Sequence, residues 1–442
     1  MDSFQIGITV TSGMMVLIFC GMRVAFASAL AGTLGLVWIL STKMGLEKAI
    51  FAGLGMAGTI PHSKAVTYGL SILPMFILIG FLAFHAGLTQ ALFEAAKRWL
   101  GRLPGGLAVA TVFATAGFAA VSGASTATAA VFARVAIPQM LKEGYDRRLA
   151  AGVVAAGGTL ATLIPPSAIL VIYAIIVEES VGKLLLAGFL PGVVSALIYG
   201  LIIVGIVSFK PSMGPKTKVY SFKEKIVSLP ATIPIFSVII IIFGSMYFGW
   251  ATPTEAGALG AFVVFVIAVI KGMRTSALKN ALFETAKLTA MIFSIIWGVL
   301  VYVRFLGFAG LPNAFSNWVQ TLDYAPLTIL LCILLVYAIL GMFMDAIGML
   351  LLTLPVFQPA IVALGYDPIW FGIIVVKMAE LCLITPPIGL NCFVVSGVRP
   401  DIPVQDVFRG CAPFFVADVV TVGVLIAFPS IVLFLPNAMS LG

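Results

Sequence analysis

The chain has 442 residues, of which 61% are apolar and 10% are charged, and its mean hydropathy is +1.17. A water-soluble protein of this length cannot bury so large an apolar fraction, so we expect a polytopic protein of the lipid bilayer. Its apolar runs are continuous rather than alternating, which favours spanning α-helices over a β-barrel. The net charge of +8 comes from scattered Lys and Arg and forms no basic stripe, so no nucleic-acid partner is indicated.

Two further classes of site are not indicated. The five cysteines lie in or beside apolar stretches without C-x-x-C spacing, so we predict no disulfide framework, no transition-metal site and no cofactor. The string Gly123-Ala124-Ser125 resembles a Gly-x-Ser motif, but no histidine lies in the matching region to act as a base. We therefore do not predict an enzyme.

Four of the apolar stretches are too long for one simple span. The stretches 104–141 and 325–363 have small or polar residues at their centres, which predicts re-entrant helical hairpins. The stretches 149–181 and 369–398 each contain a Pro-Pro pair, which predicts a helix broken at membrane depth. The remaining predicted spans are 4–20, 24–40, 68–90, 184–208, 230–248, 254–271, 287–305 and 412–438.

Several features repeat at one spacing along the chain. Gly144-Tyr145-Asp146 recurs 221 residues later as Gly365-Tyr366-Asp367, and Pro165-Pro166 recurs as Pro386-Pro387 at the same offset. The chain therefore reads as two repeats, each with a hairpin and a Pro-Pro-broken helix. We place the first repeat at 1–208, a cytoplasmic linker at 209–229 and the second repeat at 230–442.

The distribution of basic residues predicts the topology. Placing the links 91–103, 142–148, 209–229, 271–287 and 399–411 with Arg23 in the cytoplasm puts 18 Lys and Arg there and five outside. Both termini then lie on the outer side and the two repeats are inverted. Inverted repeats with paired broken helices are typical of secondary transporters with a site near the midplane, and a duplicated channel is the alternative. The partly apolar segments 43–64 and 275–287 are expected to be amphipathic surface helices.

The broken segments are the candidate sites, because non-helical backbone at membrane depth is tolerated where it lines a cavity or finds new partners. The first hairpin centre, 121–128, supplies hydroxyls and Gly123, and Pro165-Pro166-Ser167 offers a free carbonyl and another hydroxyl. Carbonyl and hydroxyl oxygens suit a small hard cation, and free N–H groups at half-helix N-termini suit an anion. Close packing of small residues explains the same pattern equally well.

Asp345, in the second repeat, is the strongest single candidate for a site residue. Asp345 lies in the hairpin centre 341–348, where a carboxylate either coordinates an ion, stabilises the tip or caps a helix. Thr385 and Asn391 flank the second break as oxygen donors. Lys377 and Glu380 lie three residues apart on one helix face, which indicates a mutually neutralised pair more than a substrate ligand.

Several strings resemble the large membrane subunit of TRAP transporters, nearly from end to end. They include 122–129, Gly144-Tyr145-Asp146, 164–167, 251–256 and 384–391. The resemblance implies a bacterial inner-membrane, sodium-driven importer of a small organic anion with an elevator mechanism. It also implies a small four-helix membrane subunit and a soluble periplasmic substrate-binding protein as partners. We expect that small subunit to be a separate chain, because no four-helix segment precedes residue 4.

The resemblance implies sodium sites near Ser122 to Thr126 with Ser167, and near Asp345 with Thr385. Where the family often has a third serine in the first tip, this chain has Ala124, so only its backbone can be a ligand. The sodium ligands that we predict are Ser122, Gly123, Ser125, Thr126, Pro165, Ser167, Gly341, Asp345, Gly348, Thr385, Pro386 and Asn391. The substrate-binding residues that we predict are Ser125, Thr128, Pro166, Thr385, Pro387 and Gly389.

Overall fold

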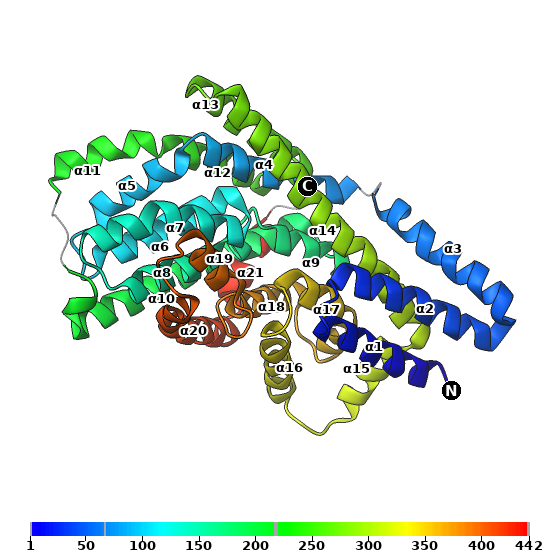
Figure 1. Ribbon diagram of the computed structural model, residues 1–442. Helices are drawn as coiled ribbons and strands as arrows, with labels where there is room; N and C mark the ends of the chain where they lie inside the picture. Colours follow the sequence, from blue (N-terminus) through cyan, green and yellow to red (C-terminus); the bar gives the residue numbers. More distant parts are fainter. Residues whose placement is uncertain (1, 66–67, 216–219, 440–442) are drawn as a thin grey trace.

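The computed structural model describes residues 2–65, 68–215 and 220–439, and every regular element in these ranges is a helix (Figure 1). Six of the described helices are long and apolar enough to cross a membrane, and there are eight if two bent helix pairs each form one span. The expectation of an all-helical, multi-span membrane protein is therefore confirmed.

One set of helices, which we call the outer group, comes from the first part of each half of the chain. Helices α2 and α14 pack along each other closely, because glycines allow their backbones to meet. A Cβ atom on Gly32 would lie 2.6 Å from the backbone nitrogen of Tyr302. The group consists of α1 (Ser3–Phe19), α2 (Val24–Met44), α3 (Leu46–Ala65), η1 (Tyr68–Ser71), α4 (Ile72–His85), α12 (Ile233–Tyr247), α13 (Pro253–Ile270) and α14 (Thr275–Ala309).

A second set, which we call the central group, contains the predicted hairpins and broken helices of both halves. Within it the halves interlock, since α8 packs against α20 and α7 packs against α19. The group consists of α6 (Gly106–Ser122), α7 (Ser125–Lys142), α8 (Arg147–Thr159), η2 (Leu160–Thr162), α9 (Ala168–Val177), α10 (Val181–Phe209), α16 (Pro326–Gly341), α17 (Ala346–Ala363), α18 (Pro368–Cys382), α19 (Leu390–Val398), α20 (Val404–Ala427) and α21 (Ser430–Ala438).

The repeat seen in the sequence recurs in the helix boundaries. Helices α7 and α17 begin and end 221 residues apart, as do the starts of α8 and α18. Gly144 and Gly365 have φ angles of +82° and +85°, which end the preceding helix. Asp146 and Asp367 then cap the next helix, each accepting two backbone N–H bonds at its first turn. The repeated Gly-Tyr-Asp string is thus a helix stop followed by a helix start.

The helices differ from the sequence-based expectation in three ways. The segments 275–287 and 287–305 form the single helix α14, because no proline or positive-φ glycine interrupts the chain before Gly310. The expected span 412–438 is divided into α20 and α21 by Pro429. The other helices lie in segments expected to be links: α5 (Leu88–Leu100), η3 (Pro211–Met213), α11 (Phe222–Ser228), η4 (Leu229–Ala231) and α15 (Leu311–Thr321).

We predict that Gly410→Ala destabilises the protein. A Cβ atom at Gly410 would collide with the backbone carbonyl of Arg148 where α20 crosses α8. The cost of such overpacking is about 1 to 3 kcal/mol. The measurement is the apparent Tm of the detergent-purified protein. Gly423→Ala on the same helix is the control, since a Cβ there has no atom of the described part of the chain within 4 Å. Equal Tm values for the two variants would contradict the close approach.

Candidate functional site

The first helix break is closed by the tip of the first hairpin. Helix α6 ends at Ser122, and Gly123 has a φ angle of +60°, in the left-handed region that glycine adopts without strain. The carbonyl oxygen of Pro166 lies so close to Gly123 that a Cβ atom there would collide with it. Pro165, Pro166 and Ser167 are all buried beneath the tip. The structure therefore brings the predicted residues of the first tip and the first break together.

The hydroxyl groups of Ser122, Thr128 and Ser167 have partners within the protein. Ser122 Oγ and Thr128 Oγ1 lie 2.7 Å apart, and Thr128 Oγ1 also donates to the Ala124 carbonyl at 2.9 Å. Ser167 Oγ donates to the carbonyl oxygen of Thr162 and caps α9 by accepting from Leu170 N at 3.3 Å. Each of these oxygens keeps lone-pair capacity for a cation.

Asn391 belongs to the first tip in space, although it follows the second break in sequence. Its Nδ2 atom lies 2.8 Å from Ser125 Oγ and 3.0 Å from the carbonyl oxygen of Ala155, and the side chain is fully buried. Helix α19 of the second half thus places the side-chain amide of Asn391 in the first site. Sequence position alone assigned Asn391 to the second break.

The second tip and the second break are arranged differently. Asp345 caps α17 by accepting from Gly348 N at 3.0 Å, so the helix-cap role considered from the sequence is present. Thr385 Oγ1 donates to the Leu381 carbonyl at 2.6 Å. Gly341 lies directly against the side chain of Cys382. Pro386 and Pro387 are exposed, followed by Gly389 with a φ angle of +43°, so the second break is open where the first is covered.

A cavity of about 160 Å³ lies between the first tip and the outer group. Ser122 and Ala124 of the tip line it together with Phe81 of the outer group. Arg134 of α7 also lines it, with an exposed side chain that makes no ion pair within the described ranges. The opposite wall carries Glu284, which is held by His85 at 3.0 Å. The cavity therefore joins a predicted ion-binding tip to a free guanidinium.

Lys377 and Glu380 form the pair expected from their spacing, with Lys377 Nζ 2.5 Å from Glu380 Oε2. Sequence reasoning missed their third partner, Asp418, whose Oδ1 lies 2.7 Å from the same ammonium. The sequence did offer one signal for Asp418, because it is a carboxylate inside an apolar span, as Asp345 is.

A hairpin tip that meets a broken helix beside a cavity, in a multi-span helical protein, is typical of membrane transport proteins. The chain belongs to the family described as the DctM component of the tripartite ATP-independent periplasmic transporter, which matches residues 11–431. The resemblance drawn from the sequence strings is therefore confirmed. The relatives are permeases, so the chain is a transport protein and not an enzyme.

Relatives with different named solutes match most of the chain. The C4-dicarboxylate TRAP transporter large permease protein DctM of Pseudomonas aeruginosa is 37% identical over 372 residues, 84% of this chain and 86% of the relative. The sialic acid permease SiaM of Vibrio cholerae is 31% identical over 432 residues, 96% of this chain and 97% of the relative. The ectoine permease TeaC of Halomonas elongata is 31% identical over 399 residues, which are 87% of this chain and 91% of the relative.

Two solved transporters share the fold at low sequence identity. The YdaH transporter of Alcanivorax borkumensis aligns with a TM-score of 0.57 and 14% identity, covering 88% of this chain and 90% of its own. MtrF of Neisseria gonorrhoeae aligns with a TM-score of 0.54 and 14% identity, and the alignment covers 87% of this chain and 85% of MtrF. At this identity the likeness concerns the fold alone.

We predict that Gly123→Ala disrupts the first site. The new Cβ atom would meet the Pro166 carbonyl and would require a positive φ angle, at a cost of about 1 to 3 kcal/mol. We expect a lower apparent Tm and a lower initial rate of solute uptake per protein in proteoliposomes. Gly205→Ala on α10 is the matched control, because a Cβ there meets no atom of the described residues within 4 Å. Wild-type values of both quantities for Gly123→Ala would show that the tip tolerates a side chain.

Proposed function

We propose that this chain is the large membrane subunit of a sodium-coupled importer that moves a small organic anion, a carboxylate or sulfonate, across the bacterial inner membrane. The observation that carries the proposal is the first tip. There, the unwound backbone at Gly123 and Ala124 and the hydroxyl groups between Ser122 and Thr128 meet the first break beside the cavity that Arg134 lines. Backbone carbonyls at broken helices bind sodium in transporters, and helix N-termini and guanidinium groups bind anions.

The sodium ligands remain those predicted from the sequence, and the geometry groups them. Ser122, Ser125 and Asn391 surround the first tip, and Ser167 lies in the break below it. Asp345 and Thr385 supply oxygens in the second half. Sodium is a hard cation that favours such oxygen donors over nitrogen and sulfur.

We also propose that the central group moves as a unit against the outer group, in an elevator mechanism. The tight α2–α14 packing within the outer group supports a fixed scaffold. The cavity lies between the two groups, where a moving site would have to open. A self-sufficient ion-coupled anion carrier or a channel, without a binding protein, is the alternative.

Removing one oxygen donor should weaken sodium dependence. We predict that Ser125→Ala, Asp345→Ala and Thr385→Ala each raise the sodium concentration for half-maximal uptake, by about tenfold if one ligand is worth about 1.4 kcal/mol. The measurement is uptake against sodium concentration in proteoliposomes at matched protein levels. Thr321→Ala is the control, because among the described residues that exposed hydroxyl bonds only to the Trp318 carbonyl. Unchanged half-saturation in all three variants would remove the assignment.

Transport should depend on two other proteins. The relatives are named as large permease proteins, and the family as a tripartite transporter. We therefore predict no sodium-driven uptake by this chain reconstituted alone, and uptake once a small four-helix membrane subunit and a solute-loaded periplasmic binding protein are added. Concentrative uptake by the single chain would favour the self-sufficient carrier. Flux that never exceeds the solute gradient would favour the channel.

Both termini are proposed to be periplasmic, on the distribution of 18 against five basic residues in the links. Alkaline phosphatase fused at the C-terminus should be active, and a cytoplasmic reporter at the same position should be silent. The reverse pattern would contradict the inverted threading.

A further inference from the structure

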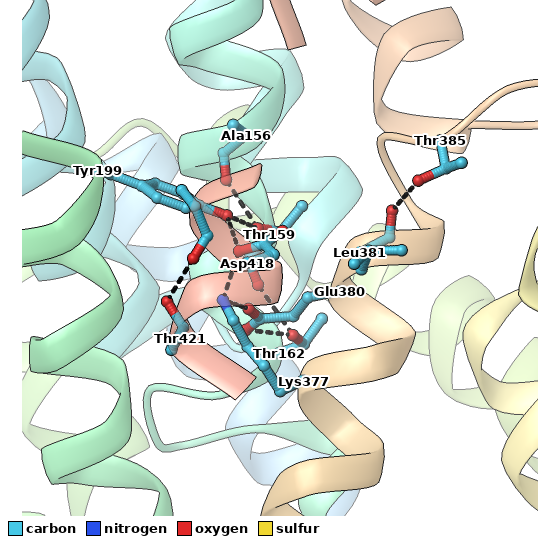
Figure 2. A network of polar contacts seen from close by, with 11 residues as sticks. Ala156, Thr159, Thr162, Tyr199, Lys377, Glu380, Leu381, Thr385, Asp418 and Thr421 are labelled. Atoms are coloured by element: carbon cyan, nitrogen blue, oxygen red, sulfur yellow. Dashed lines mark hydrogen bonds and ion pairs between the residues drawn. The ribbon is translucent and has the colours of Figure 1, made fainter. Parts of the chain in front are cut away.

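A cluster of charged side chains lies at the junction of the two halves, apart from the cavity and both tips (Figure 2). Lys377 and Glu380 come from α18, and Asp418 comes from α20. Tyr199 of α10 and Thr162 of η2 complete it. The three charged side chains have no exposed surface at all. Any imbalance of charge here is therefore not relieved by water.

Each contact in the cluster is short. The Lys377 ammonium lies between the two carboxyl groups, 2.5 Å from Glu380 Oε2 and 2.7 Å from Asp418 Oδ1. Glu380 Oε1 accepts from Thr162 Oγ1 at 2.7 Å, and Asp418 Oδ1 also accepts from Tyr199 OH at 2.6 Å. Three of the four carboxyl oxygens thus have donors, while Asp418 Oδ2 is buried without a hydrogen-bond partner within the described ranges.

The formal charges in the cluster do not balance. Two carboxylates and one ammonium leave one negative charge in excess, and an unpaired buried charge costs several kcal/mol. No second cation neutralises it among the described residues. Arg147 and Arg148 of α8 face α20 but pair with Asp406 near the start of that helix.

The other elements that pack against Asp418 supply neutral groups. Tyr199 faces it from α10 and Thr159 approaches Tyr199 from α8 at 3.4 Å. Cys411, on α20 itself, lies 3.6 Å from the Cys392 sulfur of α19. None of these groups brings a positive charge to the cluster. One added proton would balance the charges without needing the space of a metal ion.

We propose that the Lys377–Glu380–Asp418 cluster is a proton-binding site that holds one proton on one of its two carboxyl groups, and Asp418 Oδ2 is the one carboxyl oxygen there that no donor occupies. The step is a simple proton transfer in which an O–H bond forms and no electrons move. Its ligand is the hydrogen ion, and the neutral cluster is the form with the proton bound.

Thr162 contacts both this site and the first helix break. Thr162 donates its hydroxyl proton to Glu380 and accepts from Ser167 Oγ through its carbonyl oxygen. Loss of this proton would leave a net negative charge in the cluster, which Thr162 connects to the proposed sodium ligand Ser167. The proton and sodium would then compete, because each stabilises the state that the other disfavours. This coupling rests on the proposed function, whereas the proton site itself does not.

Infrared spectroscopy of the purified chain tests the proton site without any transport. A protonated carboxylic acid absorbs at a carbonyl frequency that a carboxylate lacks, and this band shifts in D₂O. Asp418→Asn removes the excess charge while keeping an acceptor for Tyr199, so the wild-type minus variant spectrum should show one lost band. Exposed Asp401→Asn should show none.

A second variant protects the test against a failure to fold. Glu380→Gln also leaves one carboxylate opposite Lys377, so it should lose the same band whichever oxygen holds the proton. The double variant Glu380→Gln and Asp418→Asn leaves Lys377 unpaired and should fall sharply in yield and Tm. Absence of a lost band in either folded single variant would overturn the proposal.

Uptake measured with the complete three-protein system tests the coupling. In the wild type the half-saturating sodium concentration should fall as pH rises, by up to about tenfold per pH unit for one competing proton. In Asp418→Asn it should not change with pH. Equal pH dependence in both proteins would overturn the coupling. Sodium-independent uptake with the infrared band intact would overturn the proposed function and leave the proton site standing.

Discussion

A backbone carbonyl or amide released inside a membrane must find a partner, because hydrocarbon offers none. The Pro-Pro pairs release such groups in both halves of this chain, and the surrounding helices are arranged around them. At the first break the carbonyl of Pro166 is covered by Gly123, the one residue type that allows the tip to come so close. That contact requires α6 to stop at Ser122 and α7 to begin at Ser125, and so it shapes the hairpin.

The same local sequence pattern occurs in both halves, but the two sites differ. In each half a positive-φ glycine stops a helix and an aspartate starts the next, and the breaks follow at the same spacing. The first break is nevertheless buried and the second is open at Pro386 and Pro387. Asn391 adds to this asymmetry, since it belongs to the second half but hydrogen-bonds Ser125 in the first half. A shared backbone pattern therefore does not impose a shared chemistry.

Electrostatics add a second constraint in the interior of the central group. Lys377, Glu380 and Asp418 are fully buried, so bulk water does not screen their charges. Asp418 and Glu380 are held by an ammonium between them, with Tyr199 and Thr162 as further donors. Removing Lys377 would leave two carboxylates without a cation, and removing both carboxylates would leave the ammonium unpaired, which is costly in a dry environment. The cluster thus links α18 to α20, and it links α18 to η2, which precedes the first break.

The sequence by itself determined the all-helical membrane class, the family, the spacing of the repeat and the positions where helices break. These depend on local chemistry: continuous apolar runs, proline without an N–H, glycine at positive φ and aspartate at a helix start. It also indicated the Lys377–Glu380 pair, because three residues along a helix bring side chains to one face.

Only the tertiary structure decided which distant residues meet. Asn391 lies 266 positions from Ser125, and Asp418 lies 38 positions beyond Glu380, on another helix. Arg134 could be placed beside Ser122 only once the cavity between the two helix groups was known. The continuous α14 was likewise missed, since a change in polarity does not end a helix unless the backbone is also interrupted. Contacts across packed helices depend on how the helices cross, and no local pattern in one chain specifies that crossing.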